Sequence, residues 1–290
     1  MNMDDLDNNA QKQVKPKRQR NKKQTQKELL NMYYEDFPKE PAQTRLEKSA
    51  FDSSQYLSQR EKTKLSEKYT KQKNENQTRY LKLLATKTKK IIVATGPAGT
   101  GKTLFATEQG AKNFLSGVYE KLIFTRPSVT VDEDIGYLPG NLEEKMAPWI
   151  RPIYDVLHQF ISPKEVLQLM EDKHIEIAPL GFMRGRTFKN TWIVADEMQN
   201  STVSQMKMLL TRLGENSRLI ITGDLDQHDR GTEMNGLEDF LNKFRGKRSA
   251  SITNVEFESN DIQREAVVKE VLDIYAGETI PESYIADSEA

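Results

Sequence analysis

The residues whose types and spacing point most directly to chemistry are the eight of GPAGTGKT. They fit the pattern G-x-x-x-x-G-K-[S/T], in which glycines let the backbone turn and bring its N–H groups against phosphate oxygens without a Cβ clash. A β-branched run precedes them and a helical pattern follows, as this motif requires. We therefore expect phosphate binding by Gly96, Pro97, Ala98, Gly99, Thr100, Gly101, Lys102 and Thr103.

The last two residues of the motif supply a positive charge and a metal ligand. The Lys102 ammonium would reach the β- and γ-phosphates of a nucleotide, and the Thr103 hydroxyl would coordinate Mg²⁺. A helix starting near Lys102 would also point its positive dipole end at the anion. The alternative, a glycine-rich turn with no ligand, is disfavoured by the flanking elements.

An acidic pair closes the apolar run TWIVADE. Asp196 lies at the expected carboxyl end of a strand, where ligands bind in open α/β sheets, and it can hold the hydration shell of Mg²⁺. Glu197 is suited to accept a proton from the water that attacks the γ-phosphate. The pair favours a hydrolase over a small-molecule kinase, which delivers phosphoryl to a substrate. The alternative for Glu197 is an ordinary surface side chain.

A third apolar run, LIITGDLDQ, ends in Thr222 and is followed by Gly223, Asp224 and Gln227. Side chains here could sense the γ-phosphate, and we assign that role to Gln227. In isolation GDLDQ is typical of a plain turn. Its place downstream of the other two motifs favours the sensor.

These motifs must be positioned by strands and helices that alternate along the chain. Short β-branched runs at 90–95, 121–125, 175–178, 191–196, 218–222 and 252–257 predict six strands. Between them lie helical patterns: Ser162, Pro163 and Glu165 form a capping box with proline at the first helical position. Apolar stripes at helical spacing predict helices around 206–213 and 237–244, and a last helix over about 261–276. The fold class is therefore α/β, with a mostly parallel sheet flanked by helices.

Composition excludes several classes of protein. The 290 residues contain no cysteine, so disulfides, cysteine nucleophiles and cysteine metal sites are absent. The three histidines, His158, His174 and His228, share no ligand spacing, and a zinc site is not expected. The start MNMDDLDNNA is wrong for a secretory signal, and the apolar runs fall far short of the ~20 residues of a membrane span. We expect a cytoplasmic protein that has no membrane partner.

The chain has 43 basic and 43 acidic side chains, but they are unevenly distributed along it. Residues 1–75 carry 17 basic and 12 acidic groups, and residues 256–290 carry 2 and 10. We expect 1–75 to be a charged extension, largely disordered or partly helical, and 277–290 to be an acidic tail. The basic segment 11–27 could be a nucleic-acid-binding arm or a solubilising tail, and both remain open.

The sequence resembles the PhoH-like proteins, a P-loop ATPase family related to the core of superfamily 1 helicases. The resemblance covers about 76–275. It rests on GPAGTGKT, TRPSV, GYLPGNLEEKMAPWIRPIYDVL, APLGFMRGRTF, DEMQN, QMKMLLTRLG, TGDLDQ and DIQREAVVKEVLDIY. LPGNLEEKM and MRGRTF are far more specific than the phosphate loop.

The family implies a RecA-like fold, ATP and Mg²⁺ as cofactors, ATPase activity, and a homo-oligomeric ring such as a hexamer. It also implies action on RNA or single-stranded nucleic acid. Some relatives carry a nuclease domain ahead of the ATPase. The 75 mostly polar residues in that place are too few for one, so nuclease activity is not expected. The stretch HDRGTEMNGLEDF resembles variants from tailed phages, which would place the protein in a host cytoplasm.

The resemblance suggests further contacts. Gln77 would read the adenine edge, while Tyr80 could stack on the base or only pack. Among five arginines that could approach the γ-phosphate, Arg212 or Arg264 is the better candidate for a donor from a neighbouring subunit. The other three are Arg126, Arg184 and Arg186. The long loop 129–146 could line a pore or a nucleic-acid track.

Together these features predict a PhoH-like ATPase domain over 76–276. It would hydrolyse ATP with Mg²⁺ and couple hydrolysis to RNA or single-stranded nucleic acid. The alternative is an ATP-dependent switch or assembly factor that acts on protein partners without nucleic acid.

Overall fold

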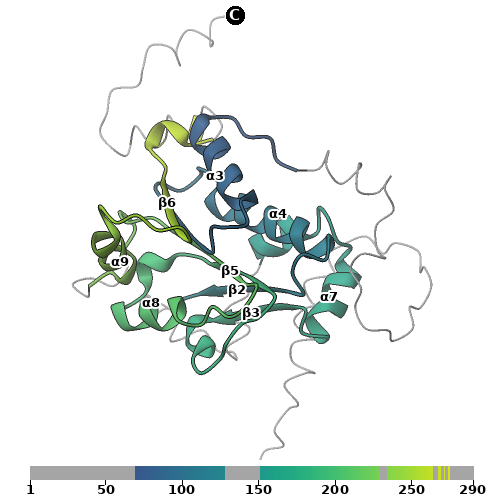
Figure 1. Cartoon of the computed structure of the whole chain (residues 1–290). Coiled ribbons are helices and arrows are strands. Elements are labelled where there is room, and N and C mark those ends of the chain that lie inside the picture. The colour runs from purple at the N-terminus through teal and green to yellow at the C-terminus, as the bar shows by residue number, and fades with distance from the viewer. Residues whose placement is uncertain are drawn as a thin grey trace, which may run out of the picture. The chain divides into compact units, whose positions relative to one another are not determined.

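A computed structural model describes residues 69–127, 151–228 and 234–263, together with positions 267, 268, 271 and 274. Its centre is a six-stranded sheet in the order β3-β2-β4-β5-β1-β6, with every pairing parallel (Figure 1). The strands are β1 (Ile91–Thr95), β2 (Lys121–Arg126), β3 (Ile175–Pro179), β4 (Thr191–Ala195), β5 (Arg218–Gly223) and β6 (Ile252–Glu256). All six predicted strands are confirmed, and so is the α/β, RecA-like class.

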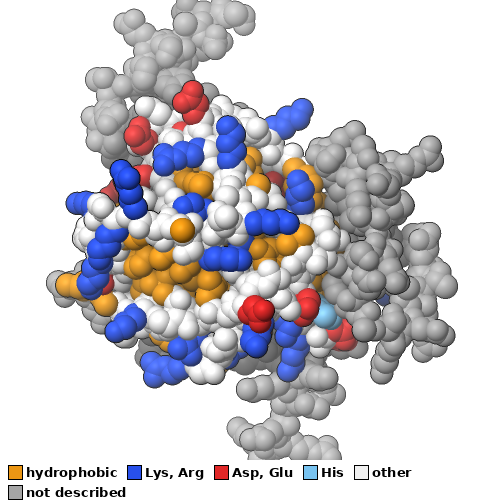
Figure 2. All heavy atoms as spheres, in the orientation of Figure 1, with side chains coloured by type: hydrophobic (Ala, Val, Ile, Leu, Met, Phe, Trp, Pro, Cys, Tyr) orange, Lys and Arg blue, Asp and Glu red, His pale blue; other side chains and the backbone are white. Residues whose placement is uncertain are grey.

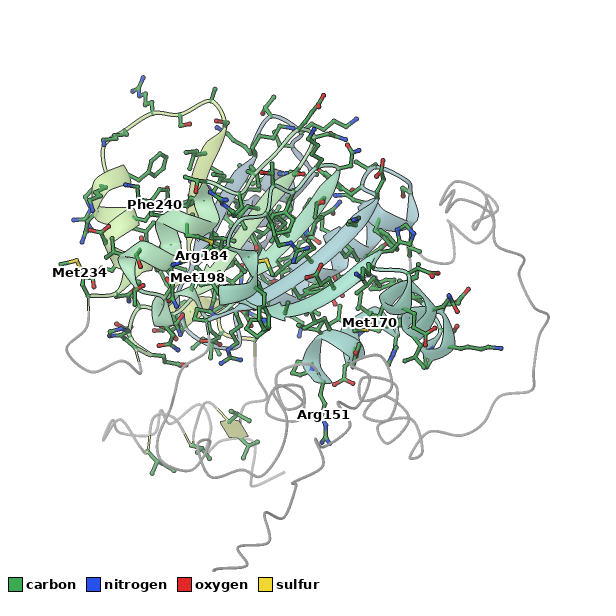
Figure 3. The ribbon with its side chains drawn as sticks, turned by 90° about the horizontal axis from the view of Figure 1, so that it is seen from below. Arg151, Met170, Arg184, Met198, Met234 and Phe240 are labelled. Atoms are coloured by element: carbon green, nitrogen blue, oxygen red, sulfur yellow. The ribbon has the colours of Figure 1, made fainter. Side chains whose placement is uncertain are left out.

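Alternation along each strand divides the core between the two faces of the sheet. Ile92, Leu122 and Trp192 belong to one face, which α3 (Glu75–Ala85) and α4 (Lys102–Leu115) cover. Val93 and Ile193 belong to the other face and join a buried cluster with residues of α8 (Val203–Leu210) and α9 (Gly236–Phe244). Figure 3 shows this second face, with Met198 and Phe240 among the side chains on it. Burial on both faces explains why β4 and β5 read as continuous apolar runs.

The helices begin where capping chemistry predicts. Ser162 caps α7 (Pro163–Glu171), and its side chain and that of Glu165 complete the expected capping box. Thr202 forms a second capping box with Gln205 at the start of α8. Three 3₁₀ turns follow strands: η2 (Leu180–Met183), η3 (Met198–Asn200) and η4 (Ser259–Asp261).

The last helix starts later than the sequence predicted. Residue 261 ends η4, and residues 262 and 263 are not helical, whereas positions 267, 268, 271 and 274 are. The Asp261 side chain accepts a hydrogen bond from Asn76 and caps its own turn, so the chain is held in a turn there. Arg264 lies outside the described residues.

Other expectations also fall outside them. The loop 129–146, the extension through residue 68 and the tail 277–290 all lie outside the described residues. The boundaries 1–75, 76–276 and 277–290 stay predictions. Contacts with the fold already begin at Tyr69, whose ring stacks on Phe160, and at Thr70, whose hydroxyl donates to Glu108 at 2.5 Å.

A buried arginine fastens α3 to the sheet. Arg218, 2% exposed at the start of β5, donates to the carbonyls of Leu84 at 2.6 Å and Leu83 at 3.0 Å. Its guanidinium lies 5.0 Å from the Trp192 ring centroid. Burial lowers the pKa of Arg218, and the helix carbonyls and the ring compensate part of its charge.

No helix in the described ranges is long and apolar enough to cross a membrane.

Gly110 of α4 sets the distance between this helix and β4. A Cβ there would lie 2.7 Å from atoms of the Trp192 ring, closer than packed atoms allow. We expect Gly110→Ala to lower the free energy of unfolding by about 1–3 kcal/mol through overpacking. Urea unfolding followed by circular dichroism measures this.

The matched control is Gly181→Ala, where a Cβ would meet no atom within 4 Å. Equal free energies of unfolding for the two variants would contradict the steric explanation.

Candidate nucleotide-binding site

The phosphate-loop sequence forms the turn between β1 and α4. Gly96 has φ +128°, and a Cβ there would lie 2.2 Å from the Phe257 carbonyl oxygen. Gly101 is the N-cap of α4 with φ +89°. Both positions need glycine, because one has no space for a side chain and both have left-handed backbone.

Lys102 folds back over this turn. Its Nζ donates to the carbonyl oxygens of Gly96 at 2.6 Å and Pro97 at 2.7 Å, and the residue is 9% exposed. Burial lowers the pKa of Lys102, while the carboxylates of Asp224, Glu197 and Asp196 act in the opposite direction. The ammonium is therefore held among backbone oxygens, near three acids from two other strand ends.

Helix α3 supports the loop from behind. The Gln77 amide donates to the Thr100 carbonyl at 3.1 Å and accepts from the Lys73 N–H at 2.7 Å. Gln77 is 3% exposed, so in this structure its side chain supports the loop, and the adenine contact stays a prediction. Tyr80 is fully buried, with its ring edge-on to Phe257 and its hydroxyl donating to the Lys102 carbonyl at 3.3 Å. Of its two expected roles, Tyr80 adopts the packing one.

A second support comes from the segment after β6, and no sequence motif predicted this contact. The Gln263 N–H donates to the Gly99 carbonyl at 3.0 Å. Asp261, 6% exposed, accepts from the Asn76 amide at 2.7 Å and so ties this segment to α3. Asn76 and Asp261 are 185 residues apart, and no local pattern links them.

Asp196 lies at the centre of a hydroxyl cluster. Its Oδ1 accepts from Thr222 Oγ1 at 2.5 Å and from Thr103 Oγ1 at 2.7 Å. The two hydroxyl oxygens are 3.5 Å apart. The structure therefore brings together the expected metal ligands Thr103 and Asp196, and it adds Thr222. A threonine at the end of the third apolar run was the available signal for that residue.

Glu197 has an unusual backbone and a fixed side chain. Its φ of +51° and ψ of 40° are left-handed values that cost a non-glycine residue about 1 kcal/mol or more. Its Oε2 accepts from Gln199 Nε2 at 2.5 Å. The backbone turn and this bond hold the carboxylate just beyond Asp196.

Gln199 is the hub that the sequence motifs did not single out. Fully buried, it donates to Glu197 and, at 3.2 Å, to the Gln227 carbonyl. Its Oε1 accepts from the Asp224 N–H at 3.0 Å. The same amide therefore joins the Glu197 carboxylate to the turn after β5. The Gln227 side chain itself is exposed, and only its backbone takes part.

The described arginines divide into distinct groups. Arg126 ends β2 at the edge of the sheet where Asp196 lies, and Arg184 is exposed. Arg186 forms a bidentate pair with Glu176, which raises the pKa of the arginine. Arg212 donates to the carbonyls of Met208 and Arg186. The Arg212 carbonyl accepts from the Phe188 N–H, just ahead of β4. Arg212 therefore lies at the amino-terminal ends of the strands, whereas the phosphate loop of its own chain lies at their carboxyl ends.

The residues present fit a magnesium-bound nucleotide. Three side-chain oxygens meet beside the N-terminus of α4, and oxygen is the donor that Mg²⁺ prefers. The glycine-lined turn leaves backbone N–H groups for phosphate oxygens, and Lys102 supplies the positive charge.

Comparison with known proteins gives the family. The profile of a family described as PhoH-like protein matches residues 69–276, more than half of the chain. This chain belongs to the PhoH-like family. It is 48% identical over 139 residues to a PhoH-like protein of Synechocystis sp., and 41% identical over 193 residues to one of Bacillus subtilis. It is also 41% identical over 208 residues to protein PhoH of Escherichia coli K12.

The matches cover 48%, 66% and 70% of this chain, and 42%, 60% and 57% of those relatives. The chain thus spans about half the length of the curated PhoH-like proteins it matches. The crystal structure of Bacteroides sp Pif1 in complex with ADP-AlF4 aligns with a TM-score of 0.29 and 15% identity, over 72% of this chain and 47% of that one.

The bonds of the Gln199 amide predict that changing this amide to a carboxylate lowers the stability of the protein. In Gln199→Glu the new carboxylate cannot donate to Glu197 or to the Gln227 carbonyl, and it would place two like charges together. We expect the free energy of unfolding to fall by about 1–3 kcal/mol, measured by urea denaturation.

Gln205→Glu is the matched control. Its side chain accepts from the Thr202 N–H in a capping box, which glutamate serves equally well. Its change should stay within about 0.5 kcal/mol. A Gln199 variant as stable as this control would show that the hub contributes nothing.

Proposed function

We propose that this PhoH-like protein binds ATP with Mg²⁺, hydrolyses it, and couples hydrolysis to RNA or single-stranded nucleic acid. The observation that carries the proposal is the convergence of Thr103, Asp196 and Thr222 beside the glycine turn, with hydroxyl-to-carboxylate distances of 2.5 and 2.7 Å. Residues from three different strand ends meet there, as phosphoryl transfer requires.

Each group has a role in binding. The glycine turn and the α4 N-terminus would receive the phosphates. Lys102 would exchange its bonds to the Gly96 and Pro97 carbonyls for phosphate oxygens, which attract an ammonium more strongly than neutral carbonyls do. Thr103, Asp196 and Thr222 would hold Mg²⁺ directly or through its water ligands. When bound, the ion would neutralise charge on the phosphates.

Glu197 would act as the general base. Its left-handed backbone and the bond from Gln199 fix the carboxylate next to the metal-binding acid. From there it would accept the proton of the attacking water. Because Gln199 also binds the Asp224–Gln227 turn, a movement of Glu197 during turnover would reach that turn directly. Gln227 would sense the γ-phosphate through this connection, because Gln199 binds both its carbonyl and Glu197.

Family membership and charge support the nucleic-acid part of the proposal. The basic segment 11–27 has eight basic and no acidic residues. The described residues form one RecA-like fold, whereas a two-domain helicase holds ATP between two. We therefore propose that copies of this chain assemble into a homo-oligomeric ring. Arg212, at the far edge of the sheet from its own phosphate loop, or Arg264 would then serve a neighbouring subunit's site.

Replacing the proposed base tests the chemistry. In Glu197→Gln, ATP binding should persist while the hydrolysis rate falls about 100-fold or more, because the amide cannot accept the proton. Fluorescent-nucleotide titration gives the affinity, and phosphate release gives the rate.

Glu215→Gln makes the same change at an exposed residue ahead of β5 and should leave the rate unaltered. A Glu197 variant that hydrolyses ATP at the wild-type rate would remove Glu197 from the mechanism.

Nucleic-acid coupling is tested by the ATPase rate with and without single-stranded RNA, on protein whose oligomeric state is measured by light scattering. We expect stimulation, and a smaller one after deletion of residues 1–75, because the basic segment is lost. Deletion of 277–290 is the control. A monomer in the presence of ATP would contradict the ring, and hydrolysis indifferent to RNA would favour the alternative of a switch acting on protein partners.

A further inference from the structure

Two basic loops from distant parts of the chain lie side by side at the amino-terminal ends of the strands, on the opposite side of the sheet from the phosphate loop. Residues 86–90 lead into β1, and residues 245–251 lead into β6. The Lys90 N–H donates to the Ser251 carbonyl at 2.7 Å, and Lys89 Nζ donates to the Ser249 carbonyl at 3.1 Å. Parallel pairing of β1 with β6 fixes this arrangement.

The two loops carry a concentrated positive charge. Neither contains an acidic residue. Their cations are Lys87, Lys89, Lys90, Arg245, Lys247 and Arg248. Within the described parts of the chain none of the six forms an ion pair, whereas nearby Lys243 pairs with Asp239 at 2.6 Å. Lys87, Arg245, Lys247 and Arg248 are exposed.

Such an arrangement is unfavourable for the protein alone, because like charges repel and, in the described residues, none of the six cations forms an ion pair with a carboxylate. Figure 2 shows Lys and Arg side chains around an apolar area on one face of the molecule. A polyanion with regularly spaced charges would relieve the repulsion and release its own counterions on binding.

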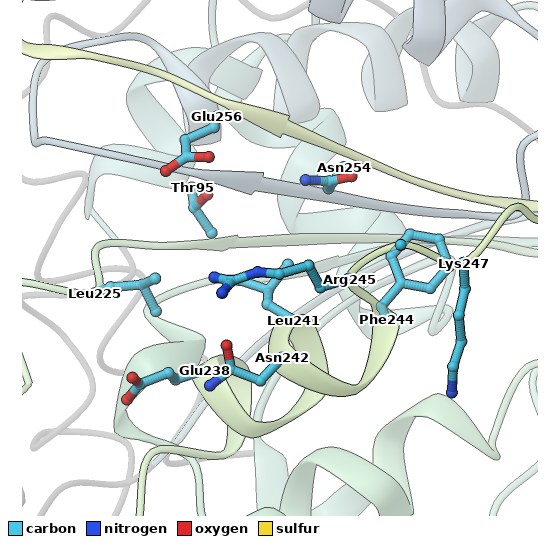
Figure 4. Close-up of a pocket in the computed structure, with 11 residues that line it drawn as sticks. Thr95, Leu225, Glu238, Leu241, Asn242, Phe244, Arg245, Lys247, Asn254 and Glu256 are labelled. Atoms are coloured by element: carbon cyan, nitrogen blue, oxygen red, sulfur yellow. The ribbon is translucent and has the colours of Figure 1, made fainter.

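A groove of about 300 Å³ begins at the second loop, three residues of which line it: Arg245, Gly246 and Lys247. It runs between α9 and the strands β1 and β6, with Lys247 at one end and Arg245 extending along it (Figure 4). Glu238 and Glu256 line the other end (Figure 4). Phosphates would therefore be repelled from the acidic end and would bind beyond the basic end, on the two loops.

The same two strands connect these loops with the nucleotide site. β1 ends at the phosphate loop, and β6 ends at Glu256, directly before Phe257, whose carbonyl oxygen lies against Gly96. Each strand has five residues and spans roughly 17 Å. A ligand on the two loops would thus bind the near ends of the strands whose far ends form the ATP site.

We propose that the loop pair 86–90 and 245–251 binds the phosphodiester backbone of a single-stranded nucleic acid. This rests on the proposed function, and it assigns that function a surface. The contacts are to phosphates, so RNA and DNA strands of equal length should both bind.

The test uses the full chain and fluorescein-labelled oligouridylate and oligothymidylate of about 20 nucleotides, followed by anisotropy at several salt concentrations. The variant K87Q/K247Q/R248Q removes three exposed cations. We expect affinity to fall at least about tenfold at low salt, and the slope of log affinity against log salt to shrink by about two. The melting temperature should stay the same or rise, since repulsion is removed.

The matched control is K164Q/K173Q/K207Q, which removes three exposed lysines that lie outside the two loops. It should keep its affinity within about twofold and its salt slope within about one. Hydrolysis without nucleic acid should be unaltered in both variants.

Equal weakening of the two variants, or none in either, would overturn the assignment of this surface. Polyglutamate that displaces the oligonucleotide from the loop pair as effectively as unlabelled RNA would indicate a site for acidic proteins and would also overturn it. Wild-type protein that binds no oligonucleotide, with hydrolysis indifferent to RNA, would defeat the nucleic-acid part of the proposed function. Wild-type binding that the loop variant leaves intact defeats this inference alone.

Discussion

Parallel pairing is the constraint on which the nucleotide site depends. Every strand runs in the same direction, so all carboxyl ends meet at one edge of the sheet. β5 lies between β1 and β4, and its register aligns Thr95 with Gly223 and Ala195 with Ile221. Thr222, near the end of β5, therefore lies between the end of β1, which bears the phosphate loop, and the end of β4, which bears Asp196. A hydroxyl at that position can contact both, and it does.

Two layers of hydrogen bonds hold this edge. In the first, hydroxyls surround Asp196 and backbone carbonyls hold Lys102. In the second, the buried Gln199 amide satisfies both its donor and its acceptor atoms, joining Glu197 to the turn after β5. Because a buried amide without partners is costly, these bonds form or break together. The acid and the turn therefore behave as one unit.

The sequence predicted what is encoded locally. The six strands followed from β-branched runs, and the phosphate loop and the acid pair were recognisable from a few adjacent residues. Thr222 and Asp261 were missed as site residues because their partners Thr103 and Asn76 lie 119 and 185 positions away, beyond any periodicity. Gln77 was expected to read a base, which stays a prediction; in the structure its amide donates to a backbone carbonyl that only the folded loop presents. Tyr80 had two open roles, and burial decided between them.

Helix α3 is fastened at both of its ends. Gln77, near its start, holds the phosphate loop through Thr100, and Arg218 holds the carbonyls of Leu83 and Leu84 at its other end. The chain enters this helix from the extension, through Lys73 and Asn74, which bond to Gln77. Mechanically, α3 is a rigid rod held at both ends, by the phosphate loop at its start and by β5 at its other end. A pull applied through the extension would load the phosphate loop first, before it strained the sheet.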